Sequence, residues 1–138
     1  MDKSRQSLQQ RIADRVSRSP RDVFLTRDFV ALSDEDQVIR ALRKLVAERK
    51  LVRLGKGVYA KARPSSLSGR AVLANPDGFL AVAQQALGRL GVEWELTQAQ
   101  KDFAAGRTTQ MPVNPVVKVK GRFSRTLRYG GNELVIER

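Results

Sequence analysis

Between residues 33 and 61 the hydrophobic pattern changes from the period of a helix to that of strands. Ser33 and Asp36 form the [ST]-x-x-[DE] pattern of a helix start, and acidic residues in the first turn suit the positive end of the helix dipole. The pattern predicts a helix that ends near Arg49 and Lys50. Its apolar face holds Val38, Ala41, Leu42, Leu45 and Val46.

A β-hairpin is predicted immediately after this helix. Residues 51–54 and 58–61 are two short strand-like runs around Gly55-Lys56-Gly57, where glycine permits the positive φ angles of a tight turn. Upstream, an apolar stripe at Leu8, Ile12 and Val16 predicts a helix over residues 4–17, and we assign the stripe to the core. Thr26 is a good N-cap for a brief helix before the longer one. Helix, short helix, longer helix and hairpin is the order of a winged helix-turn-helix.

In a helix-turn-helix protein the second helix enters the major groove of DNA, where its polar face meets base edges and phosphates. At about 100° per residue, the face opposite the apolar one carries polar side chains suited to that task. They are Gln37, Arg40 and Lys44, with Arg43 toward the side. The hairpin, or wing, adds Arg53 and Lys56. The alternative is that these cations form only a solvated face. The acidic first turn moves the expected contacts further along the helix.

The charge balance favours a polyanionic partner. Lys and Arg number 26 and Asp and Glu 14, so the formal net charge is +12. Such a surplus suits DNA, RNA or an anionic membrane surface. Residues 1–64 hold 16 basic and 8 acidic side chains, and residues 65–138 hold 10 and 6. The excess is therefore concentrated in the half that contains the predicted helix-turn-helix.

Two residue types are missing, and their absence argues against catalysis. The chain has neither Cys nor His, so it lacks thiolates and imidazoles, which are common nucleophiles, bases and metal ligands. We expect no enzyme activity, no cofactor and no metal. No apolar run approaches the roughly 20 residues that span a bilayer. The N-terminus does not read as a signal peptide, and we expect a bacterial cytoplasmic protein that associates with the nucleoid when bound to DNA.

A second module is predicted after a linker at residues 63–69, which are rich in Pro, Ser and Gly. This gives a winged domain over residues 1–64 and a C-terminal module over 65–138. Asn75-Pro76 predicts the start of a helix that ends at Gly91. A short strand within 92–96 and a short helix over 97–105 follow, with Trp94 as a core anchor. Alternation from Val117 onward predicts a small antiparallel sheet, so the fold class is α+β.

Basic side chains alternate along this predicted sheet. They offer a second contact to a polyanion, with a solvated sheet face as the alternative. The residues are Lys118, Lys120, Arg122, Arg125 and Arg128.

Two segments resemble the AbiEi-like antitoxin family of type IV toxin-antitoxin systems. The first runs from Ala41-Leu42-Arg43-Lys44-Leu45 through Leu51-Val52-Arg53-Leu54-Gly55-Lys56-Gly57-Val58-Tyr59. It is similar to that family's recognition helix and R-hydrophobic-G-x-G-hydrophobic-Tyr wing. The second is Thr108-Thr109-Gln110-Met111-Pro112 with the strands from Lys118 to Arg128 and Glu133-Leu134-Val135-Ile136-Glu137. It is similar to the family's T-x-Q-x-P ending. Gly91 to Gly106 departs from the family pattern, because Glu93-Trp94-Glu95 and a charged helix are inserted there.

The resemblance implies an autorepressor that binds double-stranded DNA at inverted repeats in its own promoter. It implies a nucleotidyltransferase-like toxin as a functional partner, counteracted without a stable complex. Winged helices also serve as protein-binding modules. The competing hypothesis is therefore an RNA- or protein-binding adaptor that uses the basic C-terminal sheet.

Overall fold

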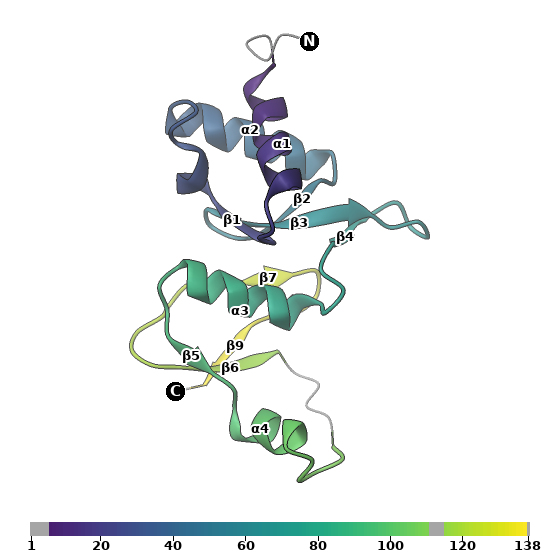
Figure 1. The fold of residues 1–138 in the computed structure, drawn as a ribbon, viewed down its shortest axis with the longest axis vertical. Coiled ribbons are helices and arrows are strands. Elements are labelled where there is room, and N and C mark those ends of the chain that lie inside the picture. The colour runs from purple at the N-terminus through teal and green to yellow at the C-terminus, as the bar shows by residue number, and fades with distance from the viewer. Residues whose placement is uncertain (1–5, 111–114, 138) are drawn as a thin grey trace.

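The computed structural model describes residues 6–110 and 115–137. Its N-terminal half has the predicted helix, short helix, longer helix and hairpin, with a strand between the first two helices that was not predicted. A helix, a strand, a short 3-10 helix and a longer helix lead into a hairpin (Figure 1). These are α1 (Leu8–Arg18), β1 (Val23–Leu25), η2 (Thr26–Phe29), α2 (Glu35–Ala47), β2 (Leu51–Gly55) and β3 (Val58–Pro64). β1 and β2 both pair antiparallel with β3, so the sheet order is β1-β3-β2.

The helix ends differ from the predicted ones by a few residues. α1 begins at Leu8 after the cap residue Ser7, and residues 4 and 5 of its predicted span lie outside the described residues. The N-cap of α2 is Asp34 and not Ser33, because the Asp34 carboxylate accepts a hydrogen bond from the Gln37 amide at 2.9 Å. α2 ends at Ala47, and Arg49 takes a left-handed φ of 64°.

The short helix η2 also starts at a different residue from the predicted one. Thr26 is its first residue and not its cap. The Asp28 carboxylate bonds back to the amide of Leu25 at 2.8 Å and closes the turn. A single 3-10 turn therefore precedes α2.

The sheet is buried on both faces, because successive residues of its strands point to opposite sides. Phe24, Leu51 and Tyr59 belong to the hydrophobic cluster that α1 and α2 form. Their neighbours belong to a second cluster, beneath the other face, together with α3 (Phe79–Arg89). These neighbours are Val23, Leu25, Val52, Leu54, Val58 and Ala60. Figure 1 shows α1 and α2 on one side of the sheet and α3 on the other.

The predicted apolar faces of both N-terminal helices are confirmed as core. Ile12 and Val16 of α1 are buried, and Leu8 packs against the same cluster. On α2 the buried residues are Val38, Ala41, Leu42 and Leu45, whereas Val46 is only half-buried.

Residues 63–69 are not the linker that their composition predicted. Arg63 and Pro64 continue β3, and β4 (Ala71–Leu73) pairs antiparallel with it, so the Ser- and Gly-rich stretch is the turn of a hairpin. The second hydrophobic cluster includes residues from both sides of position 64. The two halves of the chain therefore share a core.

α3 begins at Phe79, three residues later than Asn75-Pro76 suggested. The Asn75 side chain closes a turn by accepting from the Asp77 amide at 2.8 Å, and it also donates to the Asp22 carboxylate at 2.9 Å. Gly78, with φ of 86°, precedes the helix, and Gly91 follows its end as predicted. Near that end the Arg89 guanidinium pairs with the Asp28 carboxylate. These contacts tie α3 to β1 and η2.

The remaining elements form a smaller C-terminal layer. They are β5 (Trp94–Glu95), α4 (Gln98–Ala104), β6 (Val116–Val119), β7 (Arg128–Tyr129), β8 (Asn132–Glu133) and β9 (Val135–Glu137). The antiparallel pairing predicted from Val117 onward is found for β7 with β8. β6 instead pairs antiparallel with β5 and parallel with β9, and neither pairing was predicted. Trp94 packs against the second hydrophobic cluster, as expected of a core anchor.

The fold class is α+β, as predicted. Among the described residues, no helix is both long and apolar enough to cross a membrane.

Candidate nucleic-acid interface

The outward face of α2 carries the polar residues that the sequence singled out. Gln37, Arg40, Arg43 and Lys44 are all exposed, because the buried residues of α2 hold the opposite side of the helix against the core. None of the three cations forms an ion pair within the described part of the chain. Their charges are therefore free to meet an anionic partner.

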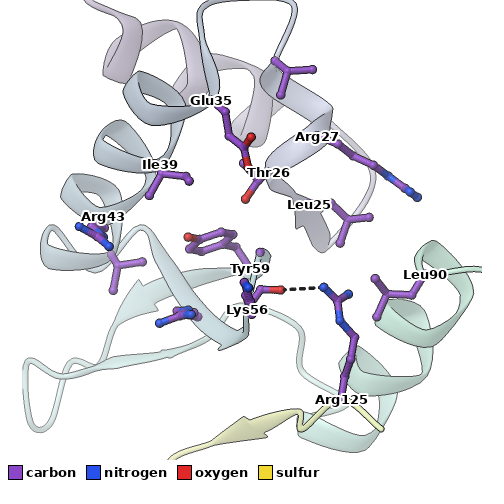
Figure 2. A pocket seen from close by; sticks show the side chains of 14 residues that line it. Leu25, Thr26, Arg27, Glu35, Ile39, Arg43, Lys56, Tyr59, Leu90 and Arg125 are labelled. Carbon is purple, nitrogen blue, oxygen red and sulfur yellow. Dashed lines mark hydrogen bonds between the residues drawn. The ribbon is translucent and has the colours of Figure 1, made fainter. Parts of the chain in front are cut away.

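Beside this face lies a groove of about 590 Å³, bounded by α2, η2, the tip of the β2–β3 hairpin and the end of α3 (Figure 2). Cationic side chains from elements far apart in the chain line it. They are Arg27, Arg43, Arg53, Lys56 and Arg125. Of the described residues that line the groove, Glu35 is the single carboxylate. The groove therefore has a strong excess of positive charge.

Three of the groove cations are held by backbone carbonyl groups and not by carboxylates. Arg125 donates to the Lys56 carbonyl at 3.3 Å, and Arg53 donates to the Gly55 carbonyl at 3.3 Å. Arg27 donates to the Arg89 carbonyl at 2.8 Å. Among residues 6–110 and 115–137, none of the five makes an ion pair. A carbonyl orients a guanidinium without cancelling its charge, so these groups remain available to phosphate or carboxylate oxygens.

The structure divides the predicted DNA-contacting residues into two groups. Arg43, Arg53 and Lys56 line the groove, whereas Gln37, Arg40 and Lys44 lie on the part of α2 that does not. Arg27 joins the groove although it was not predicted. Its position on a single 3-10 turn has no periodic pattern that would have marked it.

The five basic residues predicted as a second polyanion contact are not gathered into one ribbon. Residues 122–127 form no strand, so the predicted alternation is interrupted there. Lys118 pairs with Glu95 at 3.7 Å, and Arg128 pairs with Glu133 at 3.1 Å. Lys120 lies at a separate shallow pocket beside Trp94, and Arg122 is exposed. Arg125 alone joins the groove at the wing.

The C-terminal segment reaches the wing because Gly55 lets it approach. A Cβ atom at Gly55 would lie 2.6 Å from the Thr126 carbonyl oxygen and 3.3 Å from a methyl group of Leu127. Leu127 is 1% exposed and belongs to the shared core. The wing is therefore braced by residues about 70 positions further along the chain, and this bracing places Arg125 beside Lys56.

Together, the element order, the β1-β3-β2 sheet and the basic hairpin define a winged helix-turn-helix domain joined to an α+β extension through a common core. The model of a family of unknown function, DUF6088, matches residues 11–137, so the chain belongs to that family. No curated protein and no solved structure matches the chain. Met111 and Pro112 of the T-x-Q-x-P segment lie outside the described residues.

Proposed function

We propose that this chain binds double-stranded DNA through α2 and the wing. The observation that carries the proposal is an array of cations on α2, on the β2–β3 hairpin and at Arg125 that have no carboxylate partner within residues 6–110 and 115–137. A winged helix-turn-helix places its longer helix in the major groove. Arg and Gln side chains on that helix have the donors and acceptors that guanine and adenine edges require.

Each group of residues has a separate task in this proposal. Gln37, Arg40 and Lys44, on the outward face of α2, face the base edges. Arg53 and Lys56, on the wing, contact the flanking phosphates. Phosphate contacts fix the position of a protein on the duplex, and base contacts supply its sequence preference.

We further propose that the chain is an autorepressor of the antitoxin type, acting in the bacterial cytoplasm on its own promoter. The resemblance of the helix and wing to AbiEi-like antitoxins supports this. The functional partner would be a nucleotidyltransferase-like toxin that forms no stable complex with the chain. Two observations test it: specific binding to the DNA upstream of the chain's own gene, and a neighbouring gene for such a toxin. If the chain shows no specific binding to this upstream DNA, the autorepressor role is wrong.

The direct test of DNA binding is selection of bound duplexes from a random library, followed by titration of a selected duplex, a random duplex and an RNA of equal length. We expect the selected duplex to bind most tightly. Binding should weaken as salt rises, because phosphate contacts release counterions. Preference for the RNA, or affinity insensitive to ionic strength, would contradict the proposal.

Arg40→Ala is expected to weaken binding to the selected duplex by about 1–3 kcal/mol and to relax the preference at one base position. The cause is the loss of a side chain that reads a base edge. Titration of the selected and random duplexes measures it. Equal losses on both duplexes would show that Arg40 does not read a base.

Lys56→Ala, on the wing, is expected to weaken binding to both duplexes by a similar factor. The slope of log affinity against log salt should fall by about one, because one phosphate contact is lost. Affinities measured across a series of salt concentrations check this prediction. An unchanged slope would place Lys56 outside the phosphate contacts.

A further inference from the structure

The groove beside α2 has an apolar floor that phosphate contacts alone would not require. Leu25, Val30, Ile39, Val46 and Leu90 contribute apolar side chains from η2, α2 and the neighbouring elements. Val30 is 49% exposed, so part of this surface is open to solvent. The volume of about 590 Å³ falls within the range of about 300–1,000 Å³ that is usual for small-molecule sites. The floor can therefore accept a compact apolar group.

Tyr59 supplies a solvent-accessible polar atom at this floor. Its side chain is 4% exposed and lines the groove, and the described residues offer its hydroxyl no hydrogen-bond partner. Figure 2 shows the hydroxyl pointing across the groove toward α2, which carries Ile39 and Arg43. The hydroxyl is not one of the buried side-chain atoms that lack a partner, so solvent reaches it from the groove. The Tyr59 hydroxyl is thus positioned to bond a ligand atom.

The rim supplies charge above the apolar floor. Arg43 from α2, Lys56 from the wing and Arg125 from the C-terminal segment approach it from different elements, with Glu35 as the opposing carboxylate. An apolar body would rest on the floor while its anionic end met these cations. A ligand with only one of these two features would leave the other part of the groove unused.

We propose that this groove is a binding site for a small amphiphilic carboxylate, a molecule with a compact apolar body and one anionic end. The body packs between η2 and α2, the Tyr59 hydroxyl donates to a ligand oxygen, and the carboxylate lies among the rim cations. This site goes beyond the proposed DNA binding, since it requires no nucleic acid. Small-molecule sites commonly combine mostly apolar walls with a few placed polar groups.

The test is calorimetric titration of the full chain with 1-naphthoate at low salt, in the absence of nucleic acid. Two further probes distinguish the contribution of the apolar body from that of the negative charge. 1-Naphthylmethylammonium has the same rings and the opposite charge, and acetate has the charge without the rings. We expect saturable binding of one naphthoate per chain and at least tenfold weaker binding of both other probes. Equal binding of naphthoate and the ammonium probe would overturn the proposal.

Variants locate the site. Tyr59→Phe, which keeps the ring in the core, and Arg43→Gln, at an exposed position, should each weaken naphthoate binding about tenfold. Arg63→Gln is the matched control, because Arg63 is exposed on β3 and does not line the groove. If both groove variants bind naphthoate as the unchanged chain does, the assignment is wrong.

Circular dichroism confirms folding of each variant, and Arg43→Gln decides the question if Tyr59→Phe does not fold. A chain that binds naphthoate but no duplex would refute the proposed function and leave this site standing. A chain that binds the duplex but not naphthoate would refute this site and leave the proposed DNA binding standing.

Discussion

Leu87→Ala is expected to lower the free energy of unfolding by about 2–5 kcal/mol, the range for truncating a buried leucine to alanine. Leu87 is on the inner side of α3, is 0% exposed, and belongs to the cluster that α3 shares with β1, β2 and β3. Its truncation removes apolar contacts and leaves a cavity between the two halves of the chain. Urea unfolding followed by circular dichroism measures the effect.

Leu67→Ala is the matched control for this substitution. Leu67 is in the turn between β3 and β4 and is 98% exposed. A surface substitution of this kind changes stability by no more than about 0.5 kcal/mol. If both substitutions had equally small effects, α3 would not be part of the core.

The same unfolding experiment tests whether the chain unfolds as one unit. Trp94, the only tryptophan, lies in the C-terminal half and packs against the shared cluster. Because that cluster joins both halves, the fluorescence of Trp94 and the circular dichroism of the helices should change at the same urea concentration. Two separate transitions would indicate that the halves fold independently.

Gly55→Ala is expected to destabilise the fold by about 1–3 kcal/mol, the usual cost of an overpacked site. The new methyl group would meet the Thr126 carbonyl oxygen at 2.6 Å, and backbone cannot swing aside as the end of a flexible side chain can. Either β2 or the segment around Thr126 must move. Thermal or urea unfolding gives the loss of stability. Reduced duplex affinity would show that Arg125 had moved with it.

Gly88→Ala provides a control of opposite sign. Gly88 is in α3, and a Cβ atom there would meet nothing within 4 Å. Alanine in a helix is favoured over glycine by about 0.5–1 kcal/mol, so this variant should be more stable than the unchanged chain. Stabilisation by Gly55→Ala of similar size would refute the close contact between the wing and residue 126.

Local patterns predicted the framework of the N-terminal half. The helical spacing of Val38, Leu42 and Leu45 identified α2 and its buried face, and the glycines of the wing identified the β2–β3 hairpin. Both patterns depend on residues only a few positions apart, so they can be recognised in the sequence alone. The predicted N-cap of α2 was wrong by one residue, because Ser33 and Asp34 can both accept a backbone hydrogen bond. The turn after Pro64 resembled a linker because turns and linkers share the same residue types.

The sequence by itself determined that residues 33–61 form a helix followed by a basic hairpin, since the residues that specify these elements are close neighbours in the chain. It also determined which side chains of α2 face outward. Only the tertiary structure decided which cations lie together in the groove. Arg125 joins Lys56 across 69 positions, and Arg27 comes from a turn without periodicity, while Arg40 and Lys44 lie outside the groove. Contacts over such separations leave no local pattern, because they arise from the packing of α3 and the C-terminal segment against the sheet.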